Sequence, residues 1–199
     1  MKRFICSTLI VMAVLVLSAC EKETSPSSTA AAEVVTPPPQ VIDTPTLAGM
    51  NNPVQTFSSD QLGLCFSYPQ GYTQLTDSST LEIVAPELSD TDLRGLFWLE
   101  MSDSFDRTAE VIADQELTTA SGVDVDHWNL MVGGEQAVVL DGMPGQDLQR
   151  RVYVVHQQTL YILAFMPTRS EITAANAQME ALYTAITNSW TWSPCPAGE

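Results

Sequence analysis

The stretch TLYILAFMPTRSEITAANAQMEALYTAI, residues 159–186, decides the fold because it joins a strand to an amphipathic helix. Its first part is almost entirely apolar and ends at Pro167, which cannot continue a central strand. Thr168 and Glu171 have the spacing of a capping box, which predicts a helix start there. One apolar stripe follows at helical spacing, formed by Ile172, Ala175, Met179, Leu182 and Ile186. We therefore expect this helix to lie on a sheet.

Strands dominate the sequence before this stretch. LFWLEMS, residues 96–102, is apolar at almost every position up to Met101, which is typical of a strand covered on both faces. The short connection at 157–159 predicts a hairpin, so the strands around it should be antiparallel. A further helix is expected over 107–117, N-capped by Asp106. Other strands are expected around 64–69, 80–86, 129–132, 136–140 and 148–156. The predicted fold class is α+β, an antiparallel sheet flanked by helices.

The order of these elements resembles that of the PsbP-like superfamily. The resemblance is carried by the segment FSYPQGY at 66–72, the early helix, the hairpin ending in TLYILAFMP at 159–167 and the closing helix. It extends over most of residues 57–192 and implies an α/β/α sandwich. Members of this superfamily act as binding or assembly factors without a shared catalytic site. The resemblance therefore implies a non-catalytic role and assigns no functional residue.

The first residues have the pattern of a secretory signal. Lys2 and Arg3 precede an uncharged run over residues 4–19, which is shorter than the roughly 20 residues that a membrane-spanning helix needs. The residues Leu17-Ser18-Ala19-Cys20 resemble the lipobox of bacterial lipoproteins. That resemblance implies a signal peptide at 1–19 and a lipid, with fatty acids such as palmitate, on Cys20. The alternatives are an ordinary cleaved signal and an uncleaved anchor.

A polar segment separates the signal from the domain. Residues 20–55 contain six prolines, many Ser, Thr and Ala, and no aromatic residue. Such a composition cannot bury enough apolar surface to offset the entropy of ordering, so we interpret it as a disordered tether behind the lipidated cysteine. Aromatic residues and apolar alternation then begin. Residues 56–199 are the predicted globular domain.

The charge is strongly one-sided. Without the signal, six basic residues face 24 acidic ones, a formal net charge of −18, and Lys22 in the tether is the last lysine. A domain with five scattered arginines cannot build the cationic surface that phosphate backbones require. Nucleic acid is therefore excluded as a partner. The acidity is typical of a solvated surface.

Two cysteines remain for the domain, Cys65 and Cys195. In an extracytoplasmic compartment disulfides persist, so these two should pair and tie the first strand to the C-terminal tail. Two buried free thiols are the alternative. A metal site on these cysteines is disfavoured because neither has a second ligand at C-x-x-C spacing.

Few residues suggest chemistry. Asp124, Asp126 and His127 could supply oxygen and nitrogen ligands to a divalent ion, although an acidic surface loop is the simpler interpretation. Trp190 and Trp192 could stack on a sugar or a peptide, but core packing is more usual for aromatics near a disulfide. Known nucleotide-binding, zinc-protease and serine-hydrolase motifs are absent from the sequence. We expect no cofactor, no catalytic residue and no enzymatic activity.

The sequence thus favours a lipoprotein held in the cell membrane or envelope through Cys20, facing the extracytoplasmic side. Its expected function is that of a binding or assembly module for another envelope protein. The alternative is a lipoprotein that binds a small ligand or a divalent metal. A pocket at Asp124, Asp126 and His127 with a distant acid would favour this alternative, whereas an apolar patch near a sheet edge would favour the first.

Overall fold

The computed structural model describes residues 53–76, 80–193 and 195. The predicted signal peptide, Cys20 and the tether up to residue 52 lie outside the described residues. Strand β1 begins at Val54, inside the segment assigned to the tether. None of the helices in the described part is long and apolar enough to span a membrane.

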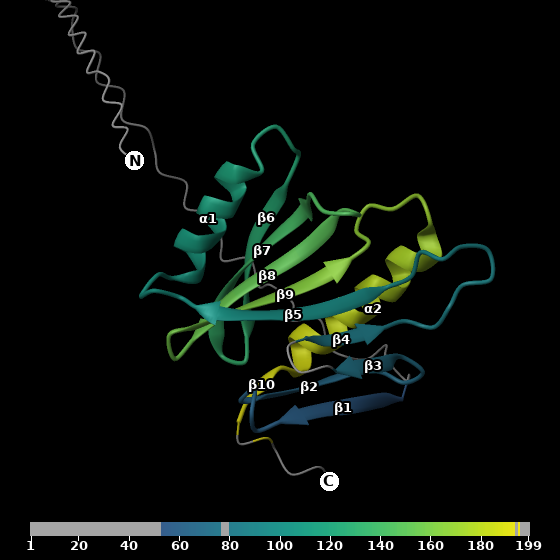
Figure 1. Cartoon of the computed structure of the whole chain (residues 1–199), viewed down its shortest axis with the longest axis horizontal. Coiled ribbons are helices and arrows are strands. Elements are labelled where there is room, and N and C mark those ends of the chain that lie inside the picture. The colour runs from purple at the N-terminus through teal and green to yellow at the C-terminus, as the bar shows by residue number, and fades with distance from the viewer. Residues whose placement is uncertain (1–52, 77–79, 194, 196–199) are drawn as a thin grey trace, which may run out of the picture. The chain divides into compact units, whose positions relative to one another are not determined.

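Seven antiparallel strands form the large sheet, in the order β3-β4-β5-β9-β8-β7-β6 (Figure 1). The hairpin predicted at 157–159 joins β8 to β9, in which His156 pairs with Thr159. The strands are Thr73–Thr76 (β3), Leu81–Val84 (β4), Leu96–Asp103 (β5), Asp126–Val132 (β6), Glu135–Met143 (β7), Gln149–His156 (β8) and Thr159–Met166 (β9).

Helices cover both faces of this sheet, as the sequence predicts. Helix α1 (Ala109–Thr119) packs on one face of the sheet, over β7 and β8, and α2 (Thr173–Ser189) packs on the other face, over β5 and β9 (Figure 1). Side chains alternate accordingly along β9: Tyr161, Leu163 and Phe165 join the core on the α2 side, while Leu160 and Ile162 face α1. The two-sided burial explains the nearly continuous apolar sequence of this strand.

A small second sheet departs from the expectation of a single sheet. It consists of β1 (Val54–Ser59), β2 (Leu64–Pro69) and β10 (Thr191–Trp192), in the order β1-β2-β10. Strand β2 packs against α2, because Phe66 stacks on Trp190 at the end of that helix with the ring centroids 5.4 Å apart. Cys65 of β2 and Cys195 form a disulfide with their Cα atoms 5.8 Å apart. The tail is thus tied to the strand at 64–69, which is the first strand that the sequence predicts and which β1 precedes in the structure.

Both predicted helix caps are wrong in position. Phe105 and Asp106 have positive φ angles of 52° and 58°, whereas an N-cap residue is extended. Thr108 caps α1 instead, and its hydroxyl accepts a hydrogen bond from the Val111 amide. Thr168 likewise caps nothing, since its hydroxyl donates to Asp141 Oδ1 at 2.8 Å.

Helix α2 begins only after Ile172, which makes no side-chain capping bond. The turn before it is closed by Ser170 and Asn176: the Ser170 amide donates to Asn176 Oδ1, and Asn176 Nδ2 donates to the Ser170 carbonyl. Ala175, Met179, Leu182 and Ile186 of the predicted stripe are all buried. The sequence therefore predicts the buried face of the helix correctly and its first turn incorrectly.

Candidate functional site

Strand β6 forms one edge of the large sheet and is the most exposed of its long strands. It turns into β7 through Gly133 and Gly134, whose φ angles of 58° and 84° suit a two-residue hairpin turn. Two large apolar side chains of this strand are exposed on opposite faces, Trp128 at 36% and Met131 at 59%.

The outer edge of β6 carries backbone groups without partners. Val132 and Glu135 flank the two-residue turn and pair with each other, so alternate residues of β6 bond to β7. The amide and carbonyl groups of His127, Asn129 and Met131 therefore point away from the sheet. Within the part of the chain that the structure describes, these groups have no hydrogen-bond partner.

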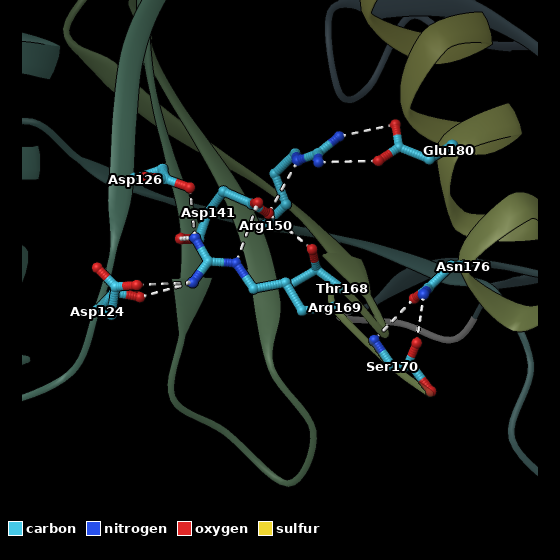
Figure 2. A network of polar contacts seen from close by, with 9 residues as sticks. All are labelled: Asp124, Asp126, Asp141, Arg150, Thr168, Arg169, Ser170, Asn176 and Glu180. Carbon is cyan, nitrogen blue, oxygen red and sulfur yellow. Dashed lines mark hydrogen bonds and ion pairs between the residues drawn. The ribbon is translucent and has the colours of Figure 1, made fainter. Parts of the chain in front are cut away.

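A network of charged side chains fixes the beginning of this strand, as Figure 2 shows. Arg169 Nη2 donates to Asp126 Oδ2 at 2.7 Å and to the Asp141 carbonyl at 3.0 Å. Its Nη1 donates to the Asp124 carbonyl at 2.8 Å. The guanidinium occupies the space beside Gly142, where a Cβ atom would lie 2.9 Å from the guanidinium carbon. Arg169 thus binds the segment that enters β6 to strand β7.

Arg150 connects the same end of the sheet to helix α2. Its Nε donates to Asp141 Oδ1 at 3.0 Å, and its two terminal nitrogens lie 2.9 Å from the two carboxylate oxygens of Glu180 (Figure 2). The guanidinium lies over the rings of Tyr183, at 4.5 Å, and of Trp128, at 5.5 Å. Burial alone would lower the pKa of Arg150, but the hydrogen bonds to Glu180 and Asp141 outweigh it and raise the pKa. Arg150 therefore stays charged.

The charged groups of this network are paired with one another. Its four carboxylates, Asp124, Asp126, Asp141 and Glu180, surround the two guanidinium groups, and Asp141 also accepts the hydroxyl of Thr168. Asp141 is only 7% exposed, and its buried carboxylate is compensated by contacts with Arg150, Arg169 and Thr168. The arrangement satisfies the rule that buried charges are paired. It can orient β6 and α2.

The three candidate metal ligands are not brought together. Asp126 and His127 are neighbours in a strand, so their side chains point to opposite faces, and His127 is exposed. Asp124 and Asp126 face Arg169 instead. Among the described residues, no group of three His, Cys, Asp or Glu side chains could hold a metal ion. Sequence reasoning missed Asp141, Arg150 and Arg169 because their partners are distant in the chain.

The tryptophans of the tail pack inward. Trp190 is 3% exposed and belongs to the core, in line with the simpler of the two interpretations. Trp192 stacks on the ring of His156, with the centroids 4.2 Å apart and the planes 4° from parallel. The His156 Nδ1 atom in turn lies 2.8 Å from Glu135 Oε1. His156 thus holds the tail at the end of the hairpin.

A cavity of about 320 Å³ lies on the α1 side of β6 and β7. It extends from the first turn of α1 to the middle of β6. The residues that line it include Arg107, Glu110, Asn129, Glu135, Val138 and Val155. Arg107 is engaged by Gln115 and by the Ser104 carbonyl, and Glu135 by His156, whereas Glu110 has no ion-pair partner within the described ranges. Two carboxylates and one guanidinium therefore line the cavity.

All five arginines of the domain are engaged by other side chains. Arg94 pairs with Glu87 at 3.5 Å and Arg151 with Glu116 at 4.0 Å, while Arg107, Arg150 and Arg169 have the partners described above. The chain has no lysine after Lys22. The described surface is therefore acidic and has no unengaged arginine.

No protein-family model and no curated protein matches the chain. Solved structures similar to it include the PsbP protein CyanoP of Synechocystis, with 11% identity over 74% of this chain and 96% of that one, and a TM-score of 0.45. LpqN of Mycobacterium tuberculosis, described as involved in cell envelope biogenesis, has 18% identity over 73% and 88% of the two chains and a TM-score of 0.47. The Saccharomyces cerevisiae Ran-binding protein Mog1p has 7% identity over 71% and 96%, with a TM-score of 0.47.

Proposed function

We propose that the protein is an extracytoplasmic lipoprotein, anchored in the membrane through Cys20, that acts as a non-catalytic binding or assembly module for another envelope component. The anchoring part of the proposal rests on the sequence Leu17-Ser18-Ala19-Cys20 after a short apolar run. A long polar segment separates Cys20 from Val54 and would let the domain reach a partner beyond the membrane surface.

The use of the charged residues supports the binding role. In the densest group of charges of the described part, each carboxylate lies within 4 Å of an arginine, and the group holds an edge strand in place. Polar catalytic groups must reach a substrate, whereas the buried pair Asp141 and Arg150 is bonded within the protein. The same strand carries unpartnered backbone groups and two exposed apolar side chains.

The anchor is tested by Cys20→Ser. Radiolabelled palmitate should enter the wild-type protein and not the variant, because the thiol is the proposed acceptor. The variant should also leave the membrane fraction or accumulate unprocessed. Cys65→Ser/Cys195→Ser is the matched control, since it removes two thiols and keeps the proposed acceptor. Equal labelling of wild type and Cys20→Ser would contradict lipidation.

The binding role is tested by purifying the anchored protein from detergent-solubilised membranes after mild chemical cross-linking. A specific envelope protein should be recovered with it in a fixed ratio. An unrelated lipoprotein expressed at the same level provides the control for chance cross-links. Recovery of the protein alone, from membranes in which the control lipoprotein captures its own known partner, would contradict the proposed function.

A further inference from the structure

We propose that the outer edge of β6 binds an extended, basic segment of a partner protein as an added β-strand, with one basic side chain entering the cavity beside Asn129. This inference rests on the proposed binding function and names its surface and the chemistry of its partner. Strand addition is a general mode of peptide recognition in which backbone hydrogen bonds provide affinity and side-chain pockets provide specificity.

The β6 edge lacks the features that protect sheet edges. Proteins shield such edges with prolines, lysines, bulges or very short strands. Strand β6 has seven residues, none of them Pro or Lys, and its register with β7 is continuous from Asp126 to Val132. The other edge strands are shorter: β1 has six residues, β3 four and β10 two. β6 is therefore the longest edge available among the described strands.

The register of the edge fits an incoming strand. His127, Asn129 and Met131 direct their amide and carbonyl groups outward at every second residue, which is the spacing that a paired strand requires. The charged network keeps these groups in a fixed orientation, since Arg169 binds Asp126 and Arg150 lies against Trp128. An edge that is already ordered loses little entropy on binding.

The cavity lies where a side chain of the added strand would point. Residues directly opposite each other in paired strands place their side chains on the same face. The residue opposite Asn129 would therefore project towards the α1 side, where Asn129 itself lines the cavity. The volume of about 320 Å³ is at the lower end of the roughly 300 to 1,000 Å³ typical of small-ligand pockets. It suits one long side chain.

Charge identifies the kind of segment. Glu110 and Glu135 line the cavity together with Arg107, which is bonded to Gln115 and the Ser104 carbonyl, and acidic residues far outnumber basic ones in the chain. A basic side chain complements the carboxylate of Glu110 and the acidic surface around it, because opposite charges in a partly desolvated site attract. A second copy of this acidic chain lacks that complementarity. So does the chain's own segment 21–52, which has one lysine against four acids.

The probe is a synthetic nine-residue peptide of alternating valine and lysine, titrated by calorimetry into the mature, detergent-solubilised protein. Hydrogen exchange of the segment 126–132 should slow when the peptide binds, because the outward amides become bonded. A peptide of the same sequence with every second amide N-methylated is the control, since it keeps the charge and loses backbone donors. It should bind at least about tenfold more weakly.

Variants of the protein separate backbone pairing from charge. Asn129→Pro removes an outward amide without breaking the β6–β7 ladder, as proline is tolerated on an edge strand. Met131→Lys keeps the ladder and adds a charge that repels a basic strand. Each should weaken binding at least about tenfold. Glu110→Gln should weaken it about two- to fivefold, while Asp90→Asn, a distant exposed control, should leave it unchanged.

Equal binding of the N-methylated peptide, or full binding by both Asn129→Pro and Met131→Lys, would overturn the inference in favour of charge alone. Dimerisation of the protein through residues 126–132 would overturn it in favour of a second copy. Faster exchange at 126–132 after deletion of residues 23–50 would overturn it in favour of the chain's own segment.

If the envelope component still co-purifies with Asn129→Pro and Met131→Lys, the edge inference fails and the proposed function stands. If nothing co-purifies with wild type, the function itself fails.

Discussion

The small sheet and the β6 end of the large sheet are held in place by different forces. The small sheet is held by aromatic packing and by the disulfide of Cys65. The ring centroid of Phe66 lies 5.1 Å from that of Phe57 and 5.4 Å from that of Trp190. The β6 end rests on ion pairs that converge on Arg150 and Arg169. The hydrophobic effect that drives aromatic packing is non-directional. A network of buried, hydrogen-bonded charges is stable only when its groups keep one mutual orientation. The difference suggests that the β6 end is built for a defined orientation.

The largest expected effect is that of Arg150→Ala. This variant leaves Asp141 buried without its closest cation and removes the contact with Glu180, so the free energy of unfolding should fall by about 3–5 kcal/mol. Urea denaturation measures the change. Arg94→Ala is the control, because its pair with Glu87 is exposed and should contribute at most about 1 kcal/mol. Equal losses from the two variants would show that the buried network contributes no more than a surface pair.

A somewhat smaller effect is expected at the small sheet. The disulfide closes a loop with a sequence separation of 130 residues, so Cys65→Ser/Cys195→Ser should lower stability by about 2–4 kcal/mol, mainly by freeing the unfolded chain. The variant should remain folded at 25 °C with a lower melting temperature, because the contacts of Phe66 persist. Mass spectrometry of the non-reduced protein should recover the linked peptides. Complete alkylation of both thiols in native protein would contradict the bridge.

The smallest expected effect concerns alkaline pH. Burial raises the pKa of the Tyr153 hydroxyl to about 12, and the nearby positive charge of Arg151 opposes this rise only in part. Because the pKa of Tyr153 is higher in the folded state than in the unfolded state, its contribution to the free energy of unfolding is fully present below about pH 10. It is lost as pH rises towards 12, by about 2 kcal/mol. Melting temperatures between pH 9 and 12 should therefore fall less steeply in Tyr153→Phe than in wild type. Parallel curves would contradict the assignment.

Much of the fold follows from local patterns. The stripe from Ala175 to Ile186 predicts the buried face of α2, and the apolar run at 96–102 predicts strand β5. The expected cover on both faces of β5 is wrong for its second half, because residues 100–103 are exposed and only Phe97 and Leu99 are buried. The helix starts were misjudged because Asp106 and Thr168 have better partners elsewhere, Gln158 for the first and Asp141 for the second. A capping motif competes with tertiary hydrogen bonds, and these are invisible in a local pattern.

The candidate site could not be predicted in the same way. Asp141 and Arg150 come together because β7 and β8 are neighbours in the sheet, and Arg169 joins them because the segment after β9 reaches β7. In the sequence, Asp124, Asp126 and His127 look like a cluster, yet strand alternation separates His127 from the other two. Sheet edges are equally hidden, since the order of strands depends on long-range pairing.

Site-specific photo-cross-linking in living cells tests the central claim, that the β6 edge is the contact surface, most directly. A photoreactive amino acid replaces Met131 on β6 or, as the matched control, Leu75 on the opposite edge strand β3; both side chains are at least half exposed. We expect one discrete cross-linked product, containing another envelope protein, from position 131 and none from position 75. The same product from position 75, or its absence from position 131, would contradict it.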